Sequence, residues 1–317
     1  MKRPHFSALA FTLLALGFAA CDSRPDSSGD PSPGASGKPK VLTTFYPTTY
    51  FTQRIAGGAA EVICPLPEDA DPIFWQPTAE EIAKFQAADL IVINGASFEK
   101  WVEKASLPMG KAVSTAKPLE GDLIRYESAV VHSHGPGGEH AHEGIDGHTW
   151  VDPINAKAQS SQILSALLRL MPEQAADFSK RAAELDADLD ALDTRLKKVS
   201  ARLGKTPVFA SHPAYNYPAR RYGWNLRNLD LDPETMPTAE QFESIAKLQE
   251  SHPAKVIIWE SAPAPEIAAK FKADLGIDSI EFTPCEMVGA EEIAAGTDYL
   301  SLMSQNLDAL SAWVDSQ

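Results

Sequence analysis

The sequence predicts an α/β protein with two (β/α) lobes, whose parallel sheets are joined by a long backbone helix. Short apolar strands alternate with helical patterns in both halves of the chain, and such alternation is typical of parallel sheets. The tetrapeptide Pro-Thr-Ala-Glu occurs at 77–80 and again at 237–240, each time opening a helix that leads into an apolar strand. Between the halves lies an amphipathic stretch of about thirty residues, which as a helix would extend roughly 45 Å and so cross both lobes.

The first twenty residues predict a secretory signal peptide. A short basic segment precedes an apolar run that is shorter than the ~20 residues of a membrane-spanning helix, and small residues follow before Cys21. The Phe-Ala-Ala-Cys sequence that ends at Cys21 resembles a bacterial lipobox, which predicts a lipid anchor on this cysteine. The alternative is ordinary cleavage that leaves a free thiol. Residues 21–39 are rich in Ser, Pro, Gly and Asp and predict a flexible tether that holds the folded body near a membrane.

The N-terminal lobe is predicted over residues 40–172, and it includes a histidine-rich loop at 132–148. Thr78 and Glu81 form a capping box that marks the start of one helix. The expected strands are KVLTTF, EVICPL and DLIVINGAS, and the expected helices are TTYFTQRIAG, PTAEEIAKFQAA and PINAKAQSSQILSALLRLM.

The linking helix is predicted over residues 173–204 and the C-terminal lobe over 205–317. Thr238 and Gln241 form a second capping box. The expected strands of this lobe are TPVFASH and AKVIIWES, and the expected helices are YPARRYG, PTAEQFESIAKLQ and APEIAAKFKADLG.

Charge and cysteine content exclude some classes of protein. The formal net charge is −15, and an acidic body argues against nucleic acid as a partner. Besides Cys21 the chain has only Cys64 and Cys285, which could form one disulfide but not a disulfide scaffold. We also expect a monomer that is held at a membrane by its lipid anchor.

The histidines are concentrated in one segment. Five of the eight fall in the segment 132–148, among glycine, proline and acidic residues. Imidazole is a common zinc ligand. Two interpretations stay open for four of these residues, namely accessory capture of metal by the loop or a solvated polar loop without that role. The four residues are His132, His134, His140 and His142.

Other candidate ligands follow predicted strands. In open parallel sheets, ligands collect beyond the carboxyl ends of the strands. A histidine and two carboxylates at strand ends of one lobe form a candidate cation site, and the alternative for each is a polar residue that caps a turn or contacts water. The residues that this rule selects are Asn94, His212, Glu260, Cys285 and Glu286.

Four segments resemble the zinc- and manganese-type solute-binding proteins of bacterial ABC transporters. The segments are AADLIVINGASFEKW, GHTWVDPINAKA, SHPAYNYPARRYGW and TDYLSLMSQNLDAL. The resemblance extends from about residue 41 to the end of the chain. It implies two (β/α) lobes joined by a long helix, with a metal held between them. It also implies a protein outside the cytoplasm, with no enzyme activity, that delivers a divalent metal to an ABC permease.

The resemblance also implies two metal ligands. His148 matches the histidine of the family's HxWxDP motif, and His212 matches the ligand that follows the first strand of the second lobe. Zinc members tend to have histidine at the latter position and manganese members glutamate. His212 therefore favours Zn²⁺, with Mn²⁺ as the alternative.

Two positions depart from the family pattern. Ile73 in DPIFWQPT stands where the family has a histidine ligand, and Thr283 stands where it has an aspartate. A zinc site in a protein usually takes four ligands, or three and a water. Glu260 and Glu286 are therefore expected to complete the set, with Cys285 or a histidine of the loop as further candidates.

The departures leave other functions open. Phe74 and Trp75 could shape a pocket for a metal chelate instead of a bare ion, and a degenerate pair of lobes could serve as an adhesin or scaffold. Two histidines, a carboxylate and an open position also describe catalytic zinc, as in a metal-dependent hydrolase. Against the hydrolase, the sequence has no H-E-x-x-H motif.

Overall fold

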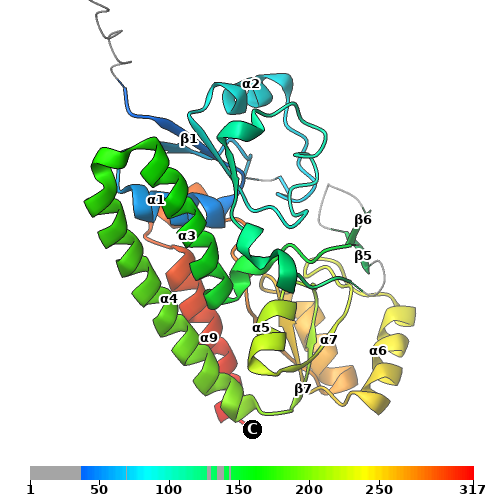
Figure 1. Cartoon of the computed structure of the whole chain (residues 1–317). Coiled ribbons are helices and arrows are strands. Elements are labelled where there is room, and N and C mark those ends of the chain that lie inside the picture. The colour runs from blue at the N-terminus through cyan, green and yellow to red at the C-terminus, as the bar shows by residue number, and fades with distance from the viewer. Residues whose placement is uncertain (1–36, 69, 127–129, 134–138, 143) are drawn as a thin grey trace, which may run out of the picture. The chain divides into compact units, whose positions relative to one another are not determined.

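The computed structural model describes residues 37–68, 70–126, 130–133, 139–142 and 144–317 (Figure 1). One compact unit begins at Lys38 and continues to Gln317. The predicted signal peptide, the lipid-anchor residue Cys21 and His134 all lie outside the described residues. Among the helices that are described, none has both the length and the apolar character needed to cross a membrane.

The first lobe contains a four-stranded parallel sheet in the order β2-β1-β3-β4. All four residues of β3 are buried, as expected for a parallel strand with both faces covered. The helix that follows β1 is α1, and α2 connects β2 to β3. The bounds are β1 (Lys40–Thr43), α1 (Tyr46–Ala56), β2 (Glu61–Ile63), α2 (Ala79–Ala87), β3 (Leu90–Ile93) and β4 (Ala112–Ser114).

The second lobe repeats this topology. Its parallel sheet has the order β10-β9-β7-β8, so within each lobe the strands lie in the order second, first, third, fourth. The two (β/α) lobes with parallel sheets that the sequence predicts are therefore confirmed. The bounds are β7 (Pro207–Ala210), α5 (Asn216–Tyr222), β8 (Asn225–Asn228), α6 (Ala239–Ser251), β9 (Val256–Trp259), α7 (Pro265–Leu275) and β10 (Asp278–Glu281).

The repeated tetrapeptide has the same structural role in both lobes. The Thr78 side chain accepts a hydrogen bond from the Glu81 backbone, and the Glu81 carboxylate accepts one from the Thr78 backbone at 2.6 Å. Thr238 and Gln241 form the equivalent pair in front of α6. Each helix connects the second strand of its lobe to the third, so the repeat marks equivalent positions in two similar lobes.

The long helix α4 (Ala175–Leu203) runs alongside both lobes (Figure 1). It was predicted over 173–204, and it begins later because residues 172–174 form a separate 3₁₀ turn. It packs against α1, α3 (Pro153–Leu170) and α9 (Tyr299–Asp315). The helix α9 is absent from the elements predicted from the sequence.

The lobes share one apolar core. A single cluster of buried side chains includes Val41 of β1, Leu189 of α4 and Val208 of β7. Because interiors are close-packed and resist deformation, this shared core holds the edges of the two sheets in a fixed relation.

Shorter elements complete the described chain. The histidine-rich segment, predicted as a loop, contains an antiparallel hairpin in which residues 132 and 140 are paired. Neither Cys64 nor Cys285 forms a disulfide. The remaining bounds are η1 (Met109–Lys111), η2 (Lys117–Asp122), β5 (Val130–Ser133), β6 (Glu139–His142), η4 (Thr149–Val151), η5 (Pro172–Gln174) and α8 (Ala290–Ala294).

Candidate metal site

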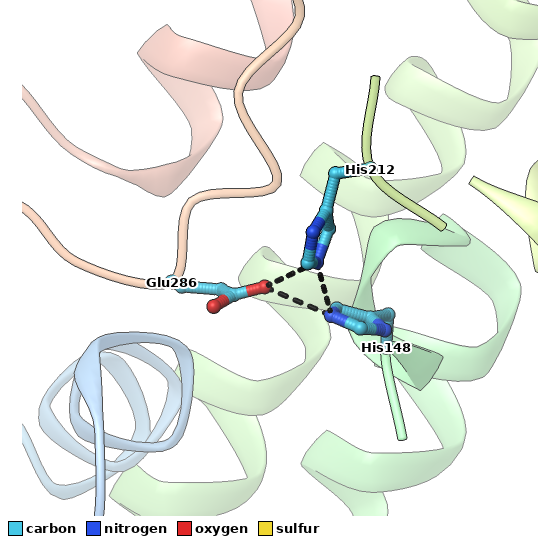
Figure 2. Close-up of side chains that lie close together, drawn as sticks. All are labelled: His148, His212 and Glu286. Carbon is cyan, nitrogen blue, oxygen red and sulfur yellow. Dashed lines mark hydrogen bonds and ion pairs between the residues drawn. The ribbon is translucent and has the colours of Figure 1, made fainter. Parts of the chain in front are cut away.

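Three side chains from separate segments converge on one point (Figure 2). His148 precedes the turn η4, His212 lies two residues after β7, and Glu286 lies in the loop after β10. The two Nε2 atoms are 3.2 Å apart. Glu286 Oε1 lies 3.0 Å from His148 Nε2 and 4.0 Å from His212 Nε2. Two nitrogens bound to one tetrahedral zinc at about 2.0–2.1 Å lie about 3.3–3.4 Å apart, so the imidazole spacing fits such an ion.

The motif around His148 forms a compact local structure. His148 begins the 3₁₀ turn η4, and the turn ends at Asp152, whose side chain caps α3 by accepting the Ile154 backbone at 2.9 Å. Pro153 occupies the first position of α3, where a missing N–H costs nothing. His148 is therefore fixed five residues before the first residue of a helix, with its side chain 1 % exposed.

Each histidine ring meets a carboxylate through Nδ1. His148 Nδ1 lies 2.8 Å from Asp146 Oδ1, and His212 Nδ1 lies 3.3 Å from Glu260 Oε2. A carboxylate at Nδ1 favours the tautomer in which Nδ1 carries the proton, so that Nε2 presents its lone pair. Both lone pairs then face the point where Glu286 also lies. Glu260, predicted as a ligand, is thus placed on the opposite side of the His212 ring.

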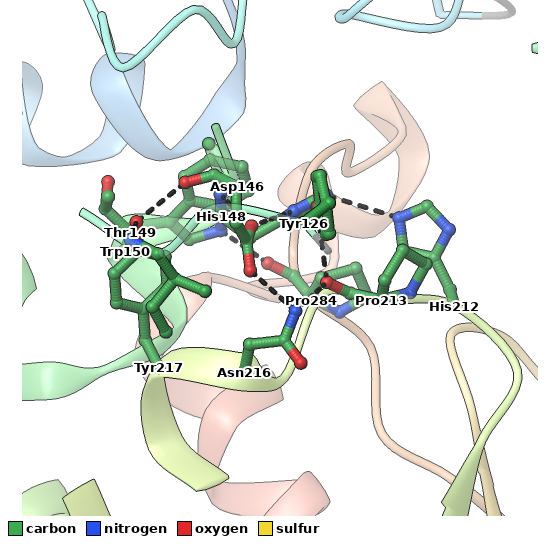
Figure 3. A network of polar contacts seen from close by, with 12 residues as sticks. Tyr126, Asp146, His148, Thr149, Trp150, His212, Pro213, Asn216, Tyr217 and Pro284 are labelled. Carbon is green, nitrogen blue, oxygen red and sulfur yellow. Dashed lines mark hydrogen bonds and ion pairs between the residues drawn. The ribbon is translucent and has the colours of Figure 1, made fainter. Parts of the chain in front are cut away.

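The second lobe holds Asp146 in place (Figure 3). Asn216, the first residue of α5, donates a hydrogen bond to Asp146 Oδ2 at 2.9 Å, and the Tyr217 hydroxyl donates to the Asp146 carbonyl at 2.7 Å. The His148 backbone N–H donates to Asp146 Oδ1 at 3.0 Å. The loop that carries His148 is therefore tied to the lobe that carries His212.

Packing from the first lobe fixes the other side of the His148 loop. The Phe98 ring meets the His148 ring edge-on, with centroids 5.7 Å apart. A Cβ added at Gly147 would lie 2.8 Å from Phe98 Cβ and 3.0 Å from its Cα, so this position requires glycine. The Asn94 side chain donates to the Gly147 carbonyl at 2.9 Å. Asn94, selected as a strand-end candidate, therefore supports the loop and is absent from the cluster.

The loop after β10 presents Glu286 and buries its neighbour. Trp150 Nε1 donates to the Pro284 carbonyl at 2.6 Å (Figure 3). Asn306 hydrogen-bonds both the N–H and the carbonyl of Thr283. Cys285 adopts a positive φ of 61° and is 0 % exposed. Burial, and the nearby Glu286 charge, raise the pKa of the Cys285 thiol. Cys285 is also absent from the group of described side chains that lie close enough together to hold one ion.

The charges at the site favour a cation. Burial alone would lower the pKa of His148, but hydrogen bonds and charges from Asp146 and Glu286 outweigh it and raise that pKa to about 10. Burial, together with the charge of Glu286, raises the pKa of Glu260 well above its usual range. Both pKa shifts have the same cause, which is that several acidic side chains are buried close together. A bound metal ion would neutralise their negative charge.

A cavity of about 420 Å³ opens beside the cluster. Ile73, 4 % exposed, lines it together with His212 and Glu286. Phe74 and Trp75, predicted to shape a chelate pocket, line a different cavity of about 300 Å³. They are therefore no part of the wall next to the histidine pair.

Residues 41–313 match the model of the family described as zinc-uptake complex component A, periplasmic. This chain belongs to that family. The resemblance predicted from the sequence is thereby confirmed. The high-affinity zinc uptake system protein ZnuA of Bacillus subtilis is 30 % identical over 320 residues, and the match covers 96 % of this chain and 94 % of that protein.

Further relatives agree with this assignment. The zinc-binding lipoprotein AdcA of Streptococcus pneumoniae is 28 % identical over 316 residues, which cover 98 % of this chain but 61 % of AdcA. The chain thus spans about three fifths of that relative's length. Among solved structures, the metal-dependent lipoprotein YcdH of Bacillus subtilis has a TM-score of 0.74 at 28 % identity, with 87 % of this chain and 98 % of YcdH covered. The Zn(II)-bound ZnuA-like domain of Streptococcus pneumoniae AdcA has a TM-score of 0.74 at 26 % identity, with 88 % and 100 % covered.

The accessory histidines of this family member are described only in part. His132, His140 and His142 belong to the strands β5 and β6, and His134 lies outside the described residues. Their capture of metal stays a prediction.

Sequence reasoning missed Asp146 and Asn216, which orient the first histidine. Asp146 had a usable signal, because an aspartate two residues before a histidine often accepts the histidine's backbone N–H in a turn. Asn216 had none, since its partner is 70 positions away in the chain.

Proposed function

We propose that this chain binds Zn²⁺ through His148 Nε2, His212 Nε2 and Glu286, outside the cytoplasm, and delivers it to an ABC permease. The observation that carries the proposal is the pair of Nε2 atoms 3.2 Å apart, each on a ring whose Nδ1 meets a carboxylate. Two imidazoles and one carboxylate suit zinc, whereas carboxylates and water suit manganese. Relatives named for zinc uptake and zinc binding support the same metal.

The experiment is a metal titration on stripped protein. The purified chain is freed of metal and titrated with zinc and with manganese by calorimetry. We expect one tight zinc site and weaker manganese binding. His148→Ala and His212→Ala should each weaken zinc by more than the ~10-fold that loss of an orienting partner can cause.

A matched control is available in the second lobe. His252 is also buried, but its Nε2 lies 3.1 Å from the Val208 carbonyl, and it is absent from the cluster. His252→Ala should leave zinc affinity within about twofold, because no ligand is lost. Unchanged affinity in both His148→Ala and His212→Ala would remove the proposed site.

The anchor is part of the same proposal. A lipid on Cys21 would keep the protein at the membrane where its permease lies. Cys21→Ser should move the protein from the membrane fraction to the soluble fraction, whereas Cys64→Ser should not. A Cys21→Ser protein that stays in the membrane fraction would contradict the anchor.

A catalytic zinc is the competing function from a different class. The same three donors with an open coordination position would also suit a hydrolase. The zinc-loaded chain is expected to hydrolyse neither an ester nor a peptide substrate above the rate of free zinc. Turnover that disappears with His148→Ala would favour the hydrolase, and micromolar or weaker binding of both metals would favour a scaffold.

A further inference from the structure

The described residues supply three donors for an ion that takes four. Zinc in proteins is almost always four-coordinate. Ile73 lines the cavity that contains His212 and Glu286, and it also lines the small cavity next to His148. Its hydrocarbon side chain offers no donor. Glu260 Oε2 meets His212 at Nδ1, away from the metal-facing Nε2. Among the described residues no further donor faces the ion, so the fourth coordination position is open to another group.

The space beside the cluster is larger than a water molecule needs. The cavity of about 420 Å³ is more than ten times the roughly 30 Å³ that one water occupies in the liquid. It falls within the range of about 300–1,000 Å³ that is typical of small-molecule sites. A zinc ion with a single bound water would leave most of it to solvent.

The residues that line the cavity favour one class of small-molecule ligand over another. Its wall includes the acids Asp71, Asp232, Glu234 and Glu260, and no lysine or arginine is among the described residues that line it. A carboxylate-rich chelator would meet like charges here, and an amine would meet opposite ones. Ile73 adds an apolar surface suited to the face of a small ring.

We propose that a small nitrogen-donor molecule of imidazole or amine type fills the fourth zinc position from this cavity. The proposal rests on the proposed zinc site and names a second ligand for it. His148, His212 and Glu286 hold the ion, while the guest binds through one neutral nitrogen and directs any ammonium group toward the acids. The bound cargo is then a zinc–amine complex.

Two measurements on the intact chain test the proposal. Cobalt(II) replaces zinc as a coloured probe, and imidazole, histamine or citrate is added to the loaded protein. We expect imidazole and histamine to change the cobalt d–d spectrum, and citrate to leave it unchanged or remove the metal. With free zinc held constant by a metal buffer, imidazole at tenfold above its own Kd should raise apparent zinc affinity by about tenfold.

Variants at Ile73 give the controls. Ile73→His would supply an internal imidazole, so it should tighten zinc and abolish the response to imidazole. Ile73→Ala removes bulk without adding a donor, so it should keep the response, and it serves if the histidine variant fails to fold. Circular dichroism checks the fold of both.

A further variant tests whether the acidic lining favours a positively charged ligand. Glu234 lines the cavity and lies outside the metal cluster, so Glu234→Gln should lower the preference for histamine over imidazole by a few fold. Glu240→Gln, on the exposed face of α6, is the matched control.

The outcomes separate the two proposals. Suppose that saturating imidazole leaves the cobalt spectrum of the wild-type protein unchanged, while His148→Ala does change that spectrum. This result would overturn the proposed second ligand and leave the proposed metal site intact. A spectrum that His148→Ala does not change would overturn the metal site itself. Loss of the imidazole response in a folded Ile73→Ala protein would also overturn the second ligand.

Discussion

The two lobes have the same strand order, yet they use the same edge of the sheet differently. The difference lies in the residues two places beyond the last paired residue of each of the two central strands. In the first lobe these are Phe45 and Asn94, and in the second they are His212 and Glu260. This edge is where open parallel sheets bind ligands. The second lobe has a histidine and a carboxylate at this edge, and the first lobe has an aromatic ring and an amide.

The first lobe uses its edge as a support. The Phe45 ring lies 4.7 Å from the Phe98 and Trp150 rings, measured between centroids, and Asn94 hydrogen-bonds the Gly147 carbonyl. Both residues thereby fix the loop that carries His148. A duplicated topology does not require duplicated donors, because one lobe can position a ligand that the other lobe helps to orient.

Two carboxylates, one in each lobe, show the same difference between support and proposed ligand binding. Glu99 in the first lobe is 3 % exposed and accepts hydrogen bonds from the Thr44 hydroxyl, the Asn94 N–H and the Gly95 N–H at 2.6, 2.6 and 3.1 Å. Glu286 in the second lobe faces two imidazoles. The first carboxylate stabilises a turn, and the second is available to a cation.

The largest expected effects come from exchanging these two acids for alanine. Glu286→Ala removes a proposed ligand, so zinc should weaken by more than ~100-fold, the upper end of what an orienting residue causes. Glu99→Ala leaves three buried donors without an acceptor and should cost about 3 kcal/mol of unfolding free energy. Zinc calorimetry and urea unfolding of the metal-free proteins measure the two quantities.

Glu103→Ala, which removes an exposed acid of the first lobe, should change neither quantity. The comparison between the lobes fails if Glu99→Ala weakens zinc as strongly as Glu286→Ala while the fold stays intact.

A smaller effect is expected at Glu260, and it separates orientation from direct binding. Glutamine keeps an oxygen that can accept the His212 Nδ1–H, so Glu260→Gln should weaken zinc by about tenfold or less. Glu260→Ala removes the acceptor and should approach the ~100-fold end of that range. Glu266→Gln on the exposed face of α7 serves as the control in calorimetry. Equal and large losses in both Glu260 variants would instead indicate a metal ligand.

Much of the fold was predictable because its signals are local. Strand composition, the two capping boxes and the amphipathic helix each depend on residues close together in the chain, and all appear in the structure. The helix α9 was missed, although its buried residues such as Met303 and Leu307 recur with helical spacing. Its partner α4 is about a hundred positions away, and that packing is invisible to a local pattern.

The sequence identified the segments that contribute to the site, but it did not predict the direction in which each side chain points. His148, His212 and Glu286 were selected by motif and strand end, and the structure brings them together. Neighbours in the same loops face elsewhere. Cys285, which has a positive φ, is buried in the core, whereas the next residue, Glu286, lies beside the histidines. Such a reversal depends on tertiary contacts at Thr283 and Pro284, which no spacing rule contains.

A smaller loss is expected from the support that the first lobe provides. The Cβ added in Gly147→Ala would lie only 2.8–3.0 Å from Cβ, Cα and Cδ2 of Phe98, and relieving this overlap should shift His148 by a few tenths of an ångström. We expect zinc to weaken by up to about tenfold, within the range for a misplaced partner of a ligand. Gly110→Ala is the control, because a Cβ there meets nothing within 4 Å. Full affinity in Gly147→Ala would show that the support from Phe98 does not set the ligand position.

The smallest effect on the tight site is expected from the histidine-rich hairpin. Its strands β5 and β6 end before Asp146, so the hairpin leads into the His148 loop. Replacing all four accessory histidines by asparagine should lower the number of zinc ions bound at high zinc. Affinity at the tight site should change by less than twofold, because its three donors remain. His252→Asn, which removes one buried imidazole elsewhere, should leave both values unchanged.

If the tight site disappears with the hairpin histidines, one of them is a fourth ligand. In that case no guest molecule is needed at that coordination position, and the first lobe contributes a second donor besides His148.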